Sequence, residues 1–323
     1  MTDRTGRPRE RPRKLPASGL VSRAPRERPG AHERFLQLGT DRARREWQRY
    51  EGTAQRELFR QLRERFLRRH ARDGRWSLDA GSGPGRFLPW IGGAGSTRVA
   101  LDLSRPMLTV GRELAAATKA PGAAVERVRG DALRPPFGSG SFTEVALVGN
   151  TLGFEGASGH QLLDAVEPLV APGGTLVLEI APGPGERSRY LRRLPPGAVR
   201  RLLSAPASAV LARLGPEGFA REPARHRPAS FRRWTVAELA DRWRVRGWSL
   251  VETMAVAPAL GPDPARLTEV AREPSAWERL LELEERLGRD PGRWPSAAAV
   301  LVAAAAPAVR TNDFVGGPAS FKP

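Results

Sequence analysis

The residues with the clearest chemical potential lie in the glycine-rich stretch LDAGSGPGRF, where Asp79 precedes Gly81, Gly83 and Gly85. Glycine allows the backbone to come close to a ligand and to turn free N–H groups toward it. A dinucleotide fingerprint, G-x-G-x-x-G, would need its third glycine where the chain has Arg86. An acid just before the turn would also repel a pyrophosphate. The stretch therefore favours a ligand that carries an ammonium group, although Asp79 alone could be a solvated strand end.

Two further carboxylates follow expected strands. Asp102 in VALDLS lies 21 residues after Gly81, and Asp131 stands in RGDALRPPF. A carboxylate at the end of the second strand can accept hydrogen bonds from both hydroxyl groups of a ribose. Asp102 could instead cap the helix expected near Arg105, for which Ser104 is the better candidate.

These motifs, in this order and spacing, resemble those of class I S-adenosylmethionine (SAM)-dependent methyltransferases. The resemblance implies SAM as cofactor, with Asp102 on its ribose, Asp131 on the adenine amino group and the Ala132 N–H group facing a ring nitrogen. Tyr50 in WQRYEG resembles an aromatic residue that closes over SAM, but its place on an amphipathic stripe also suits a core residue. The implied cofactor-binding residues are Asp79, Gly81, Gly83, Gly85, Asp102, Leu103, Asp131, Ala132, Asn150 and Tyr50.

The stretch GDALRPPFGSGSFTEVALV resembles, more narrowly, the D-A-x-x-L-P-F-x-x-x-S-F-D-x-V run of the ubiquinone and menaquinone methyltransferase-like branch. It departs from that run at Pro135 and at Thr143, and LVAPGGTLVLE resembles the later L-x-P-G-G-x-L run. The resemblance covers residues 76–182 and, more weakly, 235–306. It specifies the cofactor and leaves the substrate open.

Methyl transfer from a sulfonium is an in-line displacement, so the protein mainly has to align the reacting atoms. The resemblance places the reacting centre in the loop GNTLGFEG, where Asn150 could contact the cofactor through its backbone or amide. Glu155 is the nearest carboxylate and could act as a base or lie on the loop surface. No catalytic residue is assigned.

Several reactions are excluded by missing residues. The chain has no cysteine for C5-pyrimidine methylation. Enzymes of this family that methylate base amino groups through an N/D-P-P-Y/F motif would have two prolines after Asn150, where this chain has Thr151 and Leu152. The four histidines are far apart in sequence and form no H-x-x-x-H pair, so we expect no metal site.

The elements that must position these residues alternate between strand and helix, which is typical of a parallel sheet covered on both faces. We expect an α/β fold with a Rossmann-like, doubly wound, seven-stranded, mostly parallel sheet and helical cap insertions. The predicted strands are 76–80, 98–103, 125–129, 143–149, 175–180, 248–256 and 297–304. The predicted helices are one long amphipathic helix at 41–72, one after Gly85, one after Ser104, and those at 159–170 and 235–246. Capping boxes are expected for Thr235 with Glu238 and for Ser275 with Glu278.

The domain organisation follows from composition along the chain. Arg- and Pro-rich residues 1–33 have too little apolar surface to offset chain entropy, which predicts a disordered basic arm. The remaining expected segments are an N-terminal helical segment (34–72), a SAM-binding core (73–182), a cap insertion (183–234), the C-terminal part of the core (235–310) with a helical insertion at 261–296, and a flexible tail (311–323).

The net charge of +18 raises a competing hypothesis, an RNA methyltransferase or RNA-binding SAM protein that uses the Arg-rich arm and cap. Nearly all the cations are Arg, a bias that a GC-rich coding sequence would also give. The leading hypothesis is a methyltransferase of a small apolar or amphipathic molecule. No run of the sequence is long and apolar enough for a membrane span, and the N-terminus lacks an apolar signal core, so we expect a cytoplasmic protein. The sequence does not indicate the oligomeric state.

Overall fold

The computed structural model describes residues 38–117, 124–154, 159–181, 234–257 and 264–309. The expected arm (1–33) and tail (311–323) lie outside these residues, as do nearly all of the expected cap (183–234) and Glu155.

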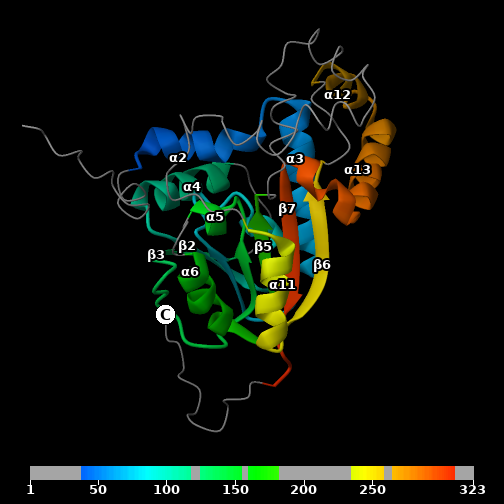
Figure 1. Cartoon of the computed structure of the whole chain (residues 1–323). Coiled ribbons are helices and arrows are strands. Elements are labelled where there is room, and N and C mark those ends of the chain that lie inside the picture. Colours follow the sequence, from blue (N-terminus) through cyan, green and yellow to red (C-terminus); the bar gives the residue numbers. More distant parts are fainter. Residues whose placement is uncertain (1–37, 118–123, 155–158, 182–233, 258–263, 310–323) are drawn as a thin grey trace, which may run out of the picture.

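Seven strands form one sheet in the order β3-β2-β1-β4-β5-β7-β6 (Figure 1). Neighbours among β1 to β5 run parallel, whereas β7 runs antiparallel to both β5 and β6. The predicted seven-stranded, mostly parallel α/β fold is therefore confirmed. The strands are β1 (Trp76–Ala80), β2 (Thr97–Asp102), β3 (Val125–Arg129), β4 (Phe142–Leu147), β5 (Val170–Ile180), β6 (Ser249–Val256) and β7 (Ala299–Ala305). They agree with the predicted strands to within two residues at each end, except that β5 begins five residues earlier.

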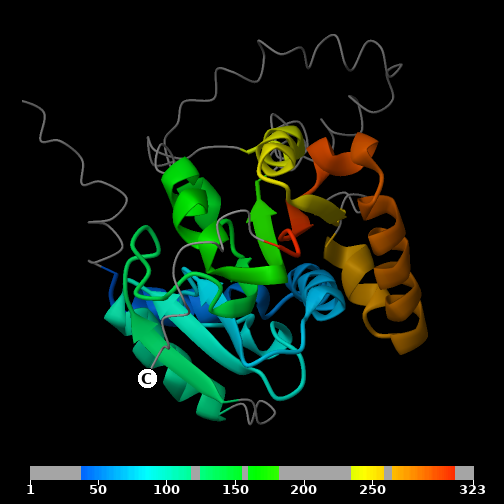
Figure 2. The same ribbon diagram turned by 90° about the horizontal axis from the view of Figure 1, so that it is seen from below.

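Helices cover both faces of the sheet, as Figure 2 shows. On one face α6 (Gly159–Val166), followed by η4 (Glu167–Leu169), and α11 (Val236–Val245) bury their apolar sides. On the other face α3 (Ala54–His70) lies against the central strands, and α12 (Pro264–Val270) and α13 (Pro274–Gly288) pack beside it, before η5 (Pro291–Ser296). Because both faces are covered, the central strands are almost entirely buried, and this burial includes polar side chains such as Ser77, Asp79 and Glu144.

The predicted single N-terminal helix is wrong, because the chain bends between two helices. α2 (Thr40–Trp47) continues into the 3₁₀ turn η1 (Gln48–Tyr50), and α3 begins only at Ala54. Gly52 is left-handed with φ 83°, and the Thr53 hydroxyl oxygen accepts a hydrogen bond from Arg56 N at 3.2 Å. A left-handed glycine followed by an N-cap threonine ends one helix and starts another.

The helix predicted after Gly85 is also wrong. The chain makes turns there and then one short 3₁₀ helix, η2 (Leu88–Trp90), before β2. Pro89 removes a backbone donor within this stretch, and glycines at positions 92, 93 and 95 follow it. In contrast, the helix predicted after Ser104 is confirmed as α4 (Arg105–Ala117).

One of the two predicted capping boxes is confirmed. Thr235 and Glu238 bond reciprocally at the start of α11. The box at Ser275 is wrong, since α13 begins one residue earlier at Pro274, and the Ser275 hydroxyl bonds Glu273 at 2.9 Å. Proline is favoured at the first helical position, which shifts the helix start away from the expected cap. No helix in the described part of the chain is long and apolar enough to cross a membrane.

Candidate cofactor and active site

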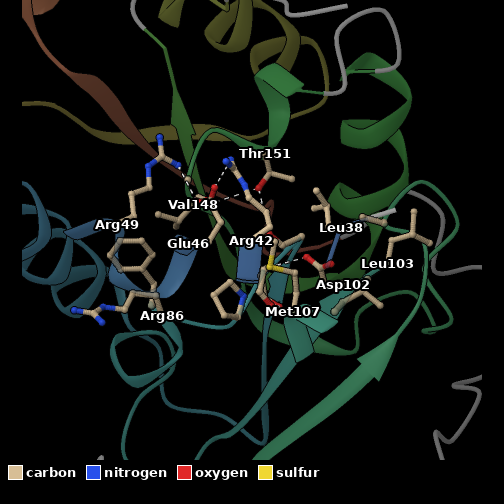
Figure 3. A pocket seen from close by; sticks show the side chains of 18 of the residues that line it. Leu38, Arg42, Glu46, Arg49, Arg86, Asp102, Leu103, Met107, Val148 and Thr151 are labelled. Atoms are coloured by element: carbon tan, nitrogen blue, oxygen red, sulfur yellow. Dashed lines mark hydrogen bonds and ion pairs between the residues drawn. The ribbon is translucent and has the colours of Figure 1, made fainter. Parts of the chain in front are cut away.

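A cavity of about 430 Å³ opens at the carboxyl ends of β1, β2 and β4, in the size range of small-molecule sites (Figure 3). The glycine turn and the ends of β2 and β3 form its floor. The segment from Leu38 to Tyr50 forms its roof. The floor residues include Gly81, Ser82, Gly83, Pro84, Leu101, Asp102, Leu103, Gly130, Asp131 and Ala132.

The glycine turn is held by backbone bonds and by its left-handed glycines. Gly81, Gly83 and Gly85 have φ of 71°, 55° and 79°. At Gly81 an added Cβ would lie 2.5 Å from Thr151 Cγ2, whereas at Gly83 it would meet no atom of the described residues within 4 Å. Gly81 is thus required by packing, and Gly83 leaves open space beside the cavity. Gly85 does not line the cavity.

Asp102 joins the turn to the start of α4. Its Oδ2 accepts a hydrogen bond from Gly83 N at 2.7 Å, and its Oδ1 accepts one from Ser104 N at 2.8 Å. Burial raises the pKa of Asp102, and these two hydrogen bonds oppose that shift. A carboxylate has about four lone-pair sites, so each oxygen keeps capacity to accept from a ligand. Ser104 does not cap α4 through its side chain, because its Oγ has no hydrogen-bond partner within the described residues.

Asp131 lies across the floor from the turn. Its Oδ1 accepts a hydrogen bond from Leu133 N at 2.9 Å, and its side chain is 21% exposed. Leu103 and Ala132 line the same part of the cavity. The structure therefore brings the predicted residues that follow β2 and β3 to one floor.

Asp79 is buried beneath this floor and does not line the cavity. Among the residues that the structure describes, its Oδ1 has no hydrogen-bond partner. Burial, with contributions from Asp102 and Glu144, raises the pKa of Asp79 to about 8. A cation bound nearby would supply the opposite charge that this carboxyl group lacks.

Asn150 does not point its amide oxygen into the cavity. This residue is left-handed with φ 66°, and its Oδ1 accepts a hydrogen bond from Ala181 N at 3.0 Å. The residues around it, Val148, Gly149 and Thr151, line the cavity instead. Thr151 was not predicted, and its hydroxyl bonds the carbonyl oxygens of Val148 and Gly81 at 3.1 and 3.4 Å. The amide of Asn150 thus joins the ends of β4 and β5.

The roof contains three charged residues that sequence reasoning did not single out, Arg42, Glu46 and Arg49. Figure 3 shows the two guanidinium groups on either side of the Glu46 carboxylate, which forms ion pairs with both. Their helical spacing was visible in the sequence, but only the bend at Gly52 places them over the floor.

Tyr50 lies where the roof meets the wall. It lines the cavity and is 7% exposed, and its ring meets Phe87 edge-on with the centroids 5.3 Å apart. Tyr50 is therefore a largely buried residue that also lines the cavity, and its contact with SAM stays a prediction. Within the described residues, no group of three or more His, Cys, Asp or Glu side chains could hold a metal ion.

Comparison with known proteins finds a similarity over the part of the chain that forms the floor of this site. A family model described as a methyltransferase domain matches residues 78–178, which include the glycine turn, Asp102, Asp131 and the loop after β4. No curated protein matches the chain. The match and the floor geometry agree with a methyl-transfer site whose cofactor is SAM.

Solved structures resemble this chain at low sequence identity. One is magnesium protoporphyrin IX methyltransferase from Synechocystis with bound S-adenosylhomocysteine (SAH), at 14% identity and a TM-score of 0.49, covering 85% of this chain and 97% of that chain. Another is geranyl diphosphate C-methyltransferase from Streptomyces coelicolor, at 17% identity and a TM-score of 0.42, covering 76% of this chain and 78% of the other.

Proposed function

We propose that this SAM-dependent methyltransferase acts on a small apolar or amphipathic molecule by in-line methyl transfer. The observation that carries the proposal is the roofed cavity, whose apolar lining comes from both the roof and the floor. These apolar residues include Leu38, Tyr50, Phe87, Leu101, Met107 and Val148. A lining of this kind suits an apolar acceptor, with a few polar groups left to orient the ligand.

The floor residues would hold the cofactor. In this proposal Asp102 accepts from the ribose hydroxyl groups, and Asp131 accepts from the adenine amino group beside Ala132 and Leu103. The turn at Gly81 and Gly83 would lie against the methionine part. Of the three glycines in the turn, Gly83 suits this contact best, because it alone has open space where a Cβ would lie.

The chain's own residues would mainly align the reactants and exclude water. Bound SAM supplies the methyl group. Val148, Gly149 and Thr151 would face the acceptor, while Asn150 holds their loop through Ala181 N. We assign no general base, and Glu155 stays a candidate by its place in the sequence alone.

The finer assignment to the ubiquinone and menaquinone methyltransferase-like branch is also a proposal and rests on the D-A-x-x-L-P-F-type run. We also propose the domain organisation that the sequence predicts, in which residues 183–234 and 261–296 are parts of a cap. In support, α12 and α13 of the second segment pack on α3, whose N-terminus follows the roof.

Isothermal titration calorimetry tests the cofactor assignment. SAM and SAH should each bind with 1:1 stoichiometry, and NAD should give no heat. No heat from SAM or SAH, together with binding of NAD, would refute it. For the acceptor class, we would incubate the protein with methyl-labelled SAM and either a hydroquinone or a short RNA. Label in the hydroquinone supports the proposal, and label in the RNA alone contradicts it.

A further inference from the structure

A buried ion pair behind the cavity wall joins elements that are far apart in the sequence. Arg63 on α3 donates from Nε and Nη2 to the two carboxylate oxygens of Glu179 on β5, at 2.9 and 2.8 Å. Both side chains are only 5% exposed, and neither lines the cavity. Well-packed apolar residues often stabilise a fold as well as a buried ion pair does, so stability is a weak reason for this pair.

Each member of the pair also contacts a residue of the cavity wall. Glu179 Oε2 accepts a hydrogen bond from Gly149 N at 3.0 Å. The central guanidinium carbon of Arg63 lies 5.1 Å from the ring centroid of Tyr50, a cation–π contact. Gly149 belongs to the loop after β4, and Tyr50 is the last residue of the roof. The ion pair therefore connects this loop to the roof.

The pair is held rigidly in this arrangement. The remaining donor group of Arg63, Nη1, bonds Phe59 O at 2.8 Å, so its guanidinium plane is fixed on three sides. Burial opposes ionisation of Glu179, yet the Arg63 guanidinium keeps the pKa of Glu179 below its ordinary value. Both groups are therefore charged, and the bidentate geometry specifies one orientation.

We propose that Arg63 and Glu179 are positioning residues. Together they hold Tyr50 at the end of the roof and Gly149 in the loop after β4 in a single geometry around the cofactor cavity. The inference rests on the proposed function only in that the cavity holds the cofactor. Methyl transfer depends on alignment, so a wall that moves by a fraction of an ångström would change binding and rate.

The test replaces both charges at once, with Arg63→Met and Glu179→Met in one protein. This double variant removes the pair without leaving a single charge buried, so its packing should persist. We would measure its melting temperature, its affinity for SAH by calorimetry, and the ¹⁹F NMR spectrum of protein labelled with 3-fluorotyrosine. The chain has two tyrosines, so Tyr50→Phe identifies the Tyr50 resonance.

A matched control uses a second ion pair away from the cavity. Arg242 and Glu167 bond at 2.7 Å between α11 and η4, with side chains 12% and 3% exposed. Neither of these two residues lines the cavity. Arg242→Met with Glu167→Met should lower the melting temperature but leave SAH affinity and the Tyr50 resonance unchanged.

We expect the Arg63 and Glu179 double variant to stay folded, to bind SAH about ten-fold more weakly, and to show a shifted or broadened Tyr50 resonance before SAH is added. A wild-type Tyr50 resonance together with wild-type affinity overturns the inference. If the double variant does not fold, Glu179→Gln undergoes the same measurements, since it keeps the size of the side chain and removes its charge. Should the wild-type protein itself fail to bind SAH, the cofactor assignment falls, and the Tyr50 resonance of the ligand-free proteins still decides whether the pair positions the wall.

Discussion

At the scale of single residues, Asp79 and Asp102 are neighbouring carboxyl groups with different surroundings. Two backbone N–H groups donate hydrogen bonds to Asp102, whereas Asp79 Oδ1 has no hydrogen-bond partner in the described part of the chain. Burial raises the pKa of both, and for Asp79 the result is about 8. In the ligand-free protein Asp79 is therefore mostly protonated at neutral pH, and a bound cation would favour its ionised form.

We predict that Asp79→Asn stabilises the ligand-free protein at high pH. Between the ordinary carboxyl pKa and about 8, the folded state holds a proton that the unfolded state has lost, so wild-type stability falls as pH rises through this window. The Asn side chain does not titrate, so the variant lacks this loss of stability. Relative to wild type, the variant should gain about 3–5 kcal/mol in its free energy of unfolding between pH 4.5 and 8.5.

Urea denaturation of both proteins at the two pH values measures this gain. Using the difference between variant and wild type cancels the titration of every group that the two share. A difference that is the same at pH 4.5 and 8.5 would mean that Asp79 titrates normally in the fold.

We also predict that Asp102→Ala weakens SAM binding by about 2–4 kcal/mol. The carboxylate would lose two charge-assisted hydrogen bonds to the ribose and leave buried hydroxyl groups unpaired. Calorimetry measures the affinity, and a melting curve checks that the fold persists. Asp164→Ala, at a half-exposed carboxylate on α6, serves as the control. Unchanged SAM affinity in Asp102→Ala would place the ribose elsewhere.

At the scale of elements, the position of the roof depends on the bend between α2 and α3. α2 packs against α4, where Ala43 contacts Met107 and Val110 in a small core of its own. α3 packs on the sheet through Leu58, Leu62 and Phe66. Because two separate cores fix the two helices, the short connection that includes Tyr50 is held over the cavity.

Helix starts provide a test at this scale. Thr235→Ala should cost about 1 kcal/mol in the free energy of unfolding, because the cap hydroxyl accepts a hydrogen bond from Glu238 N at 3.1 Å. Ser275→Ala should cost less than about 0.5 kcal/mol, because this residue makes no cap in α13. Chemical denaturation compares the two variants. Equal costs would contradict the helix start at Pro274.

At the scale of the whole molecule, the motifs assigned to the cofactor all lie after the Arg- and Pro-rich residues 1–33 in the sequence. Residues 1–33 carry many cations and few apolar side chains. We therefore predict that deleting residues 1–33 leaves the melting temperature and the SAM affinity unchanged. A loss of either one would show that the arm contributes to the fold or the site.

The same deletion separates the two substrate classes. If the acceptor is a small molecule, activity should not change. If the acceptor is RNA, the deletion should lower RNA affinity and flatten its salt dependence, because fewer phosphate counterions would be released. An RNA titration of both proteins at two salt concentrations measures this. Affinity that is high, steeply salt-dependent and dependent on the arm would contradict the small-molecule proposal.

The sequence by itself determined the sheet and the floor motifs. Strand periodicity is local, and parallel strands bring their carboxyl ends to one edge, so Asp102, Asp131 and the glycine turn could be placed together without a structure. The helix expected after Gly85 failed because Pro89 and the glycines after it outweighed the repeating pattern of strand and helix.

Only the tertiary structure decided which residues complete the site. Arg63 and Glu179 are 116 positions apart, and no local pattern links an arginine on an amphipathic helix to a glutamate at the end of a strand. The use of the Asn150 amide by Ala181 N, and the raised pKa of Asp79, likewise depend on neighbours from other elements. Local propensity sets the elements, whereas burial and pairing arise when the packed elements exclude water, and these fix the charge and position of each side chain.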